Sequence, residues 1–547
     1  MGNMQPASKH PQRRLDGFSP VADADRRRDI LIATCAALMA VVASASGLSV
    51  AQQDLALDLN ASQSGVLWII NAFIVALAAL LLPMGAIADR WGRKPVLVAG
   101  LVVFGVSTAA AGFVDTLGLM VAMRVIAGVG AAMIMPVTLS VITSSFPQDT
   151  RSQAIGVWSA VAGGGGLLGM IAAALLVDLA SWRWLFALPV VLAVAALIMT
   201  ARFVPNSREH RDAPYDIVGA LFAVVAVGGV VLGIHEGPER GWASPIAIAG
   251  LVGGIVATSG FIVHELRQAE PLLDLRAFRD RRLAAGSTAL LLLFAISAGI
   301  FVVLFPFFQA VLGWTALNSI LGLLPMIVAM MGASGLAAAV SARFGARATV
   351  LCGVGTAAVG LALMAALVSA DGGYLSVLPG LLLVGLGMGL TQPPATESII
   401  SSLPPERQGV ASALNDTTRE VGSAIGIALL GAVLSAVYSD SMKSALASFP
   451  RRVADVADEG IGRAFDIAGQ QHDKVQAATL IDAAQEAFVD GWAASIWVGA
   501  AVMGALFVFL VLRAPRIPPP GARTPAEEGS APVRDEVATA SGIGATR

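Results

Sequence analysis

The stretch GVLWIINAFIVALAALLLPMGAIADRWGRK, residues 65–94, contains a pattern that recurs along the whole chain. Its first twenty-four residues carry no charged side chain, whereas the six that follow include Asp89, Arg90, Arg93 and Lys94. A helix needs about 20 apolar residues to cross the hydrocarbon core of a bilayer. The stretch therefore predicts a membrane-spanning helix that ends in a short basic loop.

The composition of all 547 residues extends this prediction to the rest of the protein. Hydrophobic residues make up 56% of the chain and charged residues 13%, whereas soluble proteins carry about 25% charged residues. Lys and Arg (35) do not outnumber Asp and Glu (37), as they would in a nucleic-acid-binding protein. These numbers exclude a soluble enzyme, a disordered chain and a nucleic-acid binder, and they predict a polytopic membrane protein.

Two features argue against a metal, a cofactor or ATP. The cysteines Cys35 and Cys352 are too few and too far apart for a zinc site or a disulfide scaffold. The glycine run 163–166 lacks the Gly-Lys-Ser/Thr that completes a phosphate-binding loop. It lies within an apolar run, so we interpret Gly165 and Gly169, like Gly385 and Gly389, as sites of close helix packing. An ion gradient remains as the source of energy.

Apolar runs of spanning length follow one another along the chain and predict an all-α protein, because barrel strands would be about 10 residues long and alternating. We count fourteen: 30–50, 65–88, 95–114, 118–142, 153–177, 183–204, 216–234, 244–264, 283–305, 318–340, 347–369, 375–396, 409–437 and 492–512.

Lys and Arg gather in the N-terminal tail and in alternate loops, whereas the short loops of the other side contain only Arg183 and Arg240. Basic loops stay in the cytoplasm, so both termini are predicted to be cytoplasmic.

A repeated loop divides the chain into two halves. Residues 89–94 read DRWGRK and residues 342–347 read ARFGAR, so Arg, an aromatic residue, Gly and a second basic residue recur in register. The loops occupy matching places if six spans, two extra spans and six more follow one another. Many secondary transporters are doubled in this way, with the substrate path between the halves.

The repeat defines the domain boundaries that we predict. A disordered cytoplasmic tail (1–29) precedes a six-helix bundle (30–204), and two extra helices with a linker (205–282) lead to a second bundle (283–512) and a disordered tail (513–547). The second bundle contains a long outer loop, 439–490, which is polar and partly helical. This loop either caps the outer vestibule or is a passive linker.

Several motifs resemble those of the major facilitator superfamily. Gly85–Lys94 is similar to motif A of that family and Arg124–Ala132 to motif B. Other segments resemble hallmarks of its 14-span drug:proton antiporter branch, the EmrB/QacA group: Gly156–Gly169 with Trp182–Phe186, Glu270–Arg279 and Ser412–Gly422. Ser44 and Met170 depart from the pattern of the branch, which usually has Asp and Pro there.

The resemblance covers about residues 30–512 and implies a major facilitator fold of 14 helices arranged 6+2+6 in the bacterial cytoplasmic membrane. It implies export of lipophilic compounds driven by inward proton flow. An exporter or importer of one specific neutral or anionic metabolite is the first alternative, and a non-transporting receptor or scaffold is the second. The expected partners are a small lipophilic substrate, protons and membrane lipid, and we expect a monomer.

Four charged residues at membrane depth are candidates for proton coupling. Asp416 and Glu420 are four residues apart and share a helix face, with Arg419 on the adjacent stripe. Asp416 either binds and releases a proton or forms a fixed salt bridge with Arg419. Arg124 either tunes nearby proton carriers or donates hydrogen bonds to a neighbouring helix, because an unpaired Arg within the bilayer costs several kcal/mol. Glu397 could join the group or lie at the interface.

Gating and substrate candidates complete the prediction. The gating candidates come from motif A and are Gly85, Asp89, Arg90, Gly92 and Arg93. Asp89 either caps a helix N-terminus or pairs with an Arg that it releases when the two halves move. Alternatively, the loop is only solvated and has no gating role. Aromatic and polar side chains suit loosely specific binding of flat apolar molecules, although most such residues in membrane helices pack or face lipid. The substrate-binding candidates are Trp68, Asn71, Phe294, Phe301 and Gln309.

Overall fold

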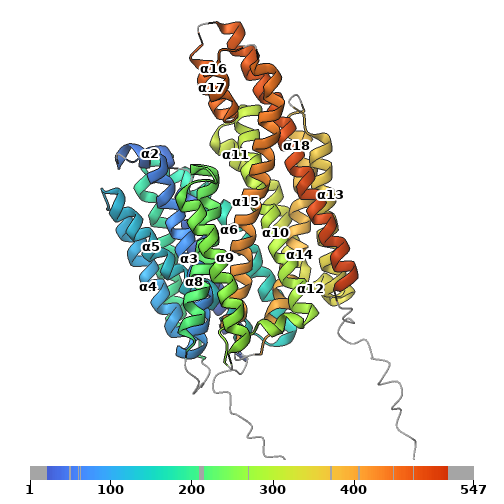
Figure 1. Cartoon of the computed structure of the whole chain (residues 1–547). Helices are drawn as coiled ribbons and strands as arrows, with labels where there is room; N and C mark the ends of the chain where they lie inside the picture. The colour runs from blue at the N-terminus through green and yellow to red at the C-terminus, as the bar shows by residue number, and fades with distance from the viewer. Residues whose placement is uncertain are drawn as a thin grey trace, which may run out of the picture.

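The computed structural model (Figure 1) describes residues 21–48, 51–59, 61, 63–207, 215–268, 270–369, 372–404, 407–447, 449–471 and 473–514. Within these ranges the chain forms helices and no β-strand. Most of both predicted tails lies outside the described residues. The first helix begins at Ala24, six residues before the predicted start of the first span, because the Asp23 side chain accepts a hydrogen bond from the Asp25 backbone N–H (3.0 Å).

Each predicted apolar run coincides with a long helix. The long helices are α1 (Ala24–Gly47), α3 (Gln63–Trp91), α4 (Arg93–Ala111), α5 (Leu117–Ser145), α6 (Gln148–Leu179), α7 (Ala187–Phe203), α8 (Ile217–Arg240), α9 (Pro245–Arg267), α10 (Arg281–Pro306), α12 (Leu324–Phe344), α13 (Ala346–Leu367), α14 (Leu378–Ser401), α15 (Gln408–Leu446) and α18 (Lys474–Arg513). Short helices are α2 (Gln52–Asp58), α11 (Ala316–Gly322), α16 (Arg451–Asp458) and α17 (Ile461–Gly469).

By length and composition, twelve segments of the described chain could cross a membrane, and α6 is a thirteenth candidate with a bend of 42°. The α14 helix has 24 residues, but it carries Thr391, Gln392, Pro393 and Pro394 in its second half and is not among these candidates. The structure therefore supports an all-helical, multi-span membrane protein, and the number of fourteen spans stays a prediction.

The long helices form two bundles and a separate hairpin (Figure 1). We call α1 and α3–α7 the N bundle, α10 and α12–α15 with α18 the C bundle, and α8–α9 the hairpin; helix contacts follow this division. We call the end at which α3 meets α4 the lower end, which is the bottom of Figure 1, and the end with α16 and α17 the upper end. The α8 helix packs on both α3 and α15 and so lies along the seam between the bundles.

Small residues set the closest helix contacts, as the glycine spacing predicts. A Cβ atom at Gly385 would lie 2.2 Å from the carbonyl oxygen of Met326, and one at Gly389 equally near that of Met330. A Cβ at Gly169 would lie 2.7 Å from the Cα of Ala43. Contacts this short leave no room for a side chain, so these glycines determine how closely α14 approaches α12 and α6 approaches α1.

The tightest of these positions allows a stability prediction. A Cβ atom at Gly426 of α15 would overlap the Ala295 backbone of α10, whereas one at Gly335 of α12 would meet nothing within 4 Å. We expect Gly426→Ala to reduce the free energy of unfolding by about 1–3 kcal/mol through overpacking. The matched change Gly335→Ala should leave stability equal or raise it by up to about 1 kcal/mol. Thermal unfolding in detergent measures both, and equal midpoints would contradict the packing.

The predicted outer loop 439–490 is mostly helical. It contains the ends of α15 and α18, which have 39 and 40 residues and reach beyond the other helices, together with α16 and α17. The Tyr438 hydroxyl donates a hydrogen bond to the Ala457 carbonyl (3.0 Å), which ties α16 to α15, and α17 packs on α18. This upper extension is therefore part of the C bundle.

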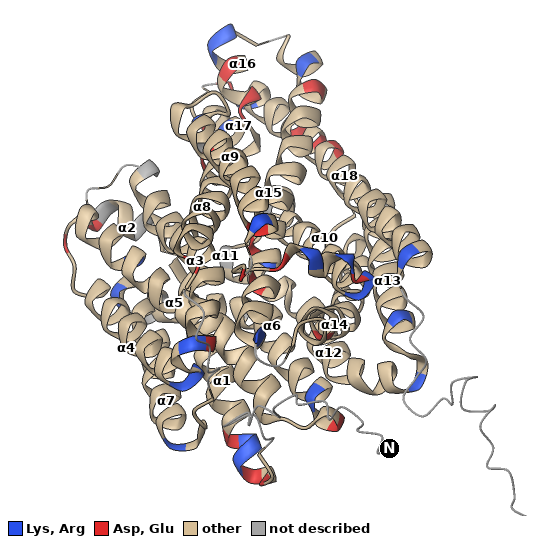
Figure 2. Ribbon diagram, turned by 60° about the horizontal axis from the view of Figure 1, so that its bottom comes forward, with Lys and Arg blue, Asp and Glu red and all other residues tan. Residues whose placement is uncertain are grey.

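Basic side chains at the lower end cap helices. Lys94 donates to the Ala201 carbonyl (2.7 Å), Arg276 to that of Leu266 (2.8 Å) and Arg347 to that of Val511, each near the C-terminus of a helix. The last carbonyls of a helix lack partners within it and carry partial negative charge. Figure 2, which brings the lower end forward, shows basic segments at several helix ends. These residues stabilise helix ends in addition to any effect on orientation.

Candidate functional site

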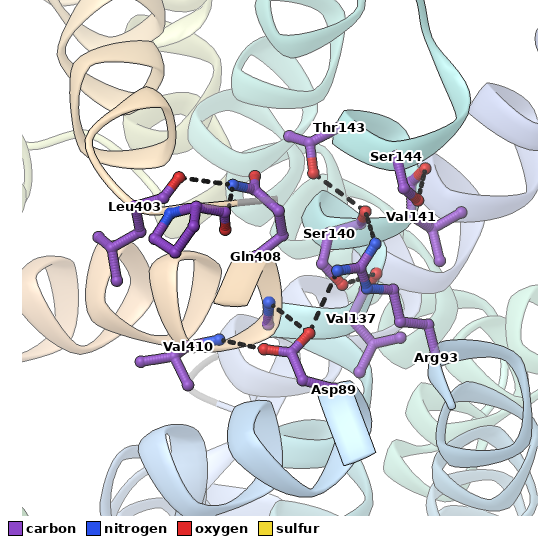
Figure 3. Close-up of polar contacts among 12 residues, drawn as sticks. Asp89, Arg93, Val137, Ser140, Val141, Thr143, Ser144, Leu403, Gln408 and Val410 are labelled. Carbon is purple, nitrogen blue, oxygen red and sulfur yellow. Dashed lines mark hydrogen bonds and ion pairs between the residues drawn. The ribbon is translucent and has the colours of Figure 1, made fainter. Parts of the chain in front are cut away.

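A carboxylate of the N bundle caps a helix of the C bundle at the lower end (Figure 3). Asp89, which is 4% exposed, accepts hydrogen bonds from the backbone N–H groups of Gly409 (2.8 Å) and Val410 (3.1 Å). These groups belong to the first turn of α15, whose own N-cap residue makes no side-chain capping bond. The carboxylate satisfies two backbone N–H groups that have no partner within the helix, and its negative charge faces the positive end of the helix dipole. Both effects stabilise the contact.

Arg93 holds this carboxylate in place (Figure 3). Its guanidinium lies 3.2 Å from the Asp89 carboxylate and donates to the Ser140 carbonyl of α5 (3.3 Å), and its side chain is 1% exposed. Two helices of the N bundle therefore support the charge that reaches across to the C bundle. We call Asp89, Arg93, Gly409 and Val410 the lower latch.

Glycines make the latch possible. A Cβ atom at Gly85 would lie 2.5 Å from the Gly409 carbonyl oxygen, so α3 and α15 approach each other here without side chains between them. Gly92 has a φ of +108°, a conformation that side-chain-bearing residues rarely adopt, and it forms the turn from α3 to α4. Arg90 is half-buried at the end of α3.

Gln408, which the sequence analysis did not single out, orders the start of α15. Its side-chain amide donates to the carbonyls of Ile400 and Leu403 (3.2 Å each) at the end of α14. These bonds help to place the first backbone N–H groups of α15, which have no partner within the helix, next to Asp89 (Figure 3). The only sequence signal is a Gln shortly after two prolines, Pro404 and Pro405, which is too common to be informative.

A polar cluster lies at the contact between the bundles, higher on α15. Asp416 is completely buried and accepts hydrogen bonds from Asn415 (3.1 Å) and Arg419 (3.5 Å). The charge of Arg419 also attracts Glu420, one turn beyond Asp416. The salt bridge considered from the sequence is thus present between Asp416 and Arg419, and the negative charge of Glu420 acts on the same guanidinium. We call Asp416, Arg419 and Glu420 the central cluster.

Aromatic rings from both bundles enclose Arg419. Its guanidinium carbon lies 4.5 Å from the ring centre of Phe294 on α10 and 5.4 Å from that of Trp158 on α6. The Trp158 indole donates a hydrogen bond to Thr138 of α5 (3.2 Å), which fixes its orientation. Trp158 was not predicted, because nothing in its local sequence distinguishes it from an ordinary buried aromatic residue.

Several buried polar atoms around the central cluster have no hydrogen-bond partner among the described residues. They include Asp416 Oδ2, Asn415 Oδ1 and Arg419 Nε; elsewhere, Gln392 Nε2 is a further buried atom of this kind. Gln392 of α14 is 1% exposed, and its side-chain oxygen lies near Gly163 of α6. Buried polar groups in proteins are nearly always hydrogen-bonded, so the two oxygens can accept, and the two nitrogens can donate, a hydrogen bond to water or to a polar group of a substrate.

Arg124 lies within the N bundle and is 1% exposed. It donates to the Ile69 carbonyl (3.2 Å), to the Ser44 hydroxyl (3.0 Å) and to the Ser44 carbonyl (3.3 Å), and it lies 4.3 Å from the ring centre of Phe73. The helix-packing hydrogen bonds considered from the sequence are therefore present. Among the described residues no carboxylate forms an ion pair with Arg124. Two backbone carbonyls, one hydroxyl and one aromatic ring stabilise its positive charge instead.

The remaining predicted residues are spread over α3, α10 and the helical turn that follows α10. Asn71 of α3 is 5% exposed and its Nδ2 has no partner among the described residues, while Trp68 is half-buried one turn nearer the upper end. Phe294 belongs to the central cluster region, but Phe301 lies two turns higher on α10. Gln309 is exposed in the π-helical turn Phe307–Val311 at the upper end, well away from Phe294.

Glu397 belongs to α14 and interacts with α6. It lies next to Arg151 and Ser152, near the start of α6, so it contributes to a second contact between the bundles in their lower half. The Ser334 hydroxyl of α12 donates to the Gly156 carbonyl of α6 (2.9 Å) in the same region.

A buried acidic group in the hairpin was also missed. Asp216, the N-cap residue of α8, lies 2.9 Å from His264 of α9, and Glu265 accepts a bond from the Leu273 backbone (3.2 Å). Burial and the neighbouring Asp216 raise the pKa of Tyr215 to about 12, so its hydroxyl stays protonated. It donates to the Pro83 carbonyl of α3 (3.2 Å) and anchors the hairpin to the N bundle.

Comparison with known proteins identifies relatives along almost the whole chain. Residues 32–427 match the model of the Major Facilitator Superfamily. The tetracenomycin C resistance and export protein of Streptomyces glaucescens is 30% identical over 91% of this chain and 93% of its own length. The multidrug efflux pump LfrA of Mycolicibacterium smegmatis is 30% identical over 82% and 90%, and the multidrug resistance protein Stp of Mycobacterium tuberculosis 29% over 87% and 90%.

Solved structures share the fold at low sequence identity. The human organic anion transporter MFSD10 has a TM-score of 0.57 at 14% identity and covers 88% of this chain and 99% of its own. The proton:xylose symporter XylE has a TM-score of 0.55 at 16% identity and covers 90% and 96%. These similarities concern the fold alone.

Proposed function

Because this chain belongs to the Major Facilitator Superfamily, we propose that it is a proton-coupled exporter of lipophilic drugs or toxic compounds that works by alternating access. The names of its relatives support the substrate class, since they describe multidrug efflux, multidrug resistance and export of tetracenomycin C. The observation that carries the proposal is the lower latch, a charged contact between the two bundles.

The latch keeps the lower end closed. Asp89 bonds to α15, and Ser334 bonds to Gly156 in the lower half of the bundles. Closing one end of the path while the other opens is what alternating access requires, and packed interfaces with discrete arrangements suit such motion. The gating role extends to Gly85, Arg90, Gly92 and Arg93, which shape the helix end that carries Asp89.

Proton coupling resides in the central cluster under this proposal. A proton on Asp416 or Glu420 removes one of the charges that attract Arg419, and the guanidinium lies between Trp158 of the N bundle and Phe294 of the C bundle. A change in proton occupancy therefore alters the contact between the bundles. Arg124 contributes a fixed positive charge within the N bundle.

The proposed exporter function also implies an orientation in the membrane and a path for the substrate. We place fourteen spans, arranged 6+2+6, in a bacterial cytoplasmic membrane, with the basic lower end and both termini in the cytoplasm. Trp68, Asn71, Phe294, Phe301 and Gln309 then contribute at successive heights along the path, with Gln309 at its outer mouth. We propose that the protein functions as a monomer.

One observation favours the alternative, a transporter of a specific neutral or anionic metabolite. Arg124 is buried without an ion-pairing carboxylate among the described residues, so the N bundle carries an uncompensated positive charge. A buried positive charge disfavours cations nearby and favours anions. Drugs that are cations would then be poor substrates.

Proteoliposomes with an internal pH dye distinguish the two functions. Under an imposed proton gradient we expect several chemically unrelated lipophilic drugs to accelerate proton movement, with unchanged traces in empty liposomes. Proton movement driven by one metabolite and by no drug would reject the exporter and favour the alternative. A resistance screen in an efflux-deficient host, using cationic, neutral and anionic compounds, then gives the charge preference.

A further inference from the structure

A narrow crevice opens at the lower end of the C bundle, away from both the latch and the central cluster. It lies between α10, α13, α14 and α18, and its volume is about 40 Å³. Apolar side chains, among them Ala285, Ala289, Val350 and Leu510, form most of its wall, and Arg282 and Arg347 contribute the charged part. A buried water needs about 10–15 Å³ on the same measure, so the crevice has room for a group of phosphate size.

The charge of this crevice is not balanced by acidic residues. None of the described residues that line it is Asp or Glu, and neither arginine forms an ion pair with a carboxylate among the described residues. Arg347 donates one bond to the Val511 carbonyl, while its Nε is buried without a partner there. The carboxylate nearest in the chain, Asp280, accepts the backbone N–H of Arg282 (2.8 Å) and caps α10.

The depth of the crevice matches the surface of a bilayer. Arg282 is the second residue of α10 and Arg347 the second of α13. Both side chains therefore project from the ends of spanning helices, at the level of the membrane surface. The apolar wall extends from them toward the middle of the bundle. Two unbalanced guanidiniums above an apolar wall fit an amphipathic anion, because Arg binds phosphate oxygens strongly and basic pockets between membrane helices bind anionic lipid headgroups.

We propose that this crevice is a binding site for the phosphate headgroup of an anionic membrane lipid, held by Arg282 and Arg347, with part of an acyl chain against the apolar wall. The lipid joins the beginnings of α10 and α13 through one phosphate. Since all the helices concerned belong to the C bundle, the site stabilises that bundle as a unit. The assignment does not depend on what the protein transports.

Lipid retention by the purified full-length protein tests the proposal. Native mass spectrometry after incubation with equal amounts of phosphatidylglycerol and phosphatidylcholine should show preferential retention of phosphatidylglycerol. We expect Arg282→Gln to weaken that retention about tenfold, the effect of one charge-assisted hydrogen bond. Arg282→Gln with Arg347→Gln should reduce it to the level of phosphatidylcholine.

Matched controls separate the site from general surface charge. Arg281→Gln removes the same charge one residue away and Arg343→Gln removes it at the end of α12, and neither residue lines the crevice. Both should retain phosphatidylglycerol as the parent does. Because Arg347 also caps α18, the single Arg282→Gln variant carries the test if the double variant fails to fold.

Three results would overturn the proposal. The first is unchanged phosphatidylglycerol retention in Arg282→Gln. The second is an equal loss in the Arg281→Gln control. The third is displacement of the lipid by millimolar inorganic phosphate, which would assign the crevice to a free anion instead of a lipid.

Discussion

Asp416→Asn is expected to abolish proton-driven drug transport while drug binding persists. The variant resembles the protonated carboxyl permanently, so Arg419 loses the carboxylate with which it forms an ion pair and the proton cycle stops. Asn has nearly the same volume as Asp, and the site is completely buried, so the change acts through charge more than through packing. A positioned proton carrier contributes about 100-fold or more to a rate, so proton movement should fall to the level of empty liposomes.

The same helix provides the control. Asp440→Asn alters an exposed carboxylate on the upper part of α15 that pairs with Lys443 at 2.9 Å, and it should leave transport unchanged. Glu420→Gln should uncouple transport as Asp416→Asn does, since both carboxylates attract Arg419. Full proton-driven transport by both single variants would remove α15 from the coupling mechanism. Loss of drug binding together with transport would point to a structural role for Asp416 instead.

Asp89→Asn is the second change with a large expected effect, this time on conformation. The side-chain amide can no longer accept both α15 N–H bonds, and Arg93 is left buried without its carboxylate. Breaking a buried ion pair by removing one partner costs about 3–5 kcal/mol. A loss of about 3 kcal/mol from the closed lower end shifts its equilibrium with the open state about 100-fold toward opening.

Spin-label distances measure this shift directly. Trp91, at the end of α3, and Phe344, at the end of α12, are 72% and 62% exposed, so cysteines there can carry labels after Cys35 and Cys352 are replaced by Ser. Asp89→Asn should lengthen the distance between the bundles at the lower end and eliminate net transport. Asp115→Asn is the matched control, because its carboxylate pairs with Arg183 at the upper end (2.8 Å). An unchanged distance distribution in Asp89→Asn would exclude the latch as a gate.

Sequence patterns predicted the helices because these depend on local properties. Apolar runs of spanning length located every long helix, and glycine spacing predicted the close packing at Gly385 and Gly389. The lengths of α15 and α18 were underestimated, since their upper parts are amphipathic and lie outside the apolar window. Helix formation there is decided by packing against α16 and α17, which a hydropathy count does not detect.

For site contacts between residues far apart in the chain, the sequence supplied one partner and the fold supplied the other. Asp89 was predicted to cap a helix or pair with Arg, but the Gly409 backbone N–H from which it accepts a hydrogen bond lies 320 residues later, in the first turn of α15. Arg419 was identified within its helix, whereas Trp158 comes from the other bundle. Arg124 was predicted to need partners, and Ser44 and Ile69 come from two further helices.

The sequence by itself determined that this is a helical, multi-span membrane protein, because hydropathy and helical periodicity are properties of neighbouring residues. Only the tertiary structure decided which helix faces meet. That depends on where glycines allow close approach and where a buried polar group finds its partner, both of which are set between residues far apart in the chain. The latch, the two rings around Arg419 and the basic crevice of Arg282 and Arg347 all arise at this level.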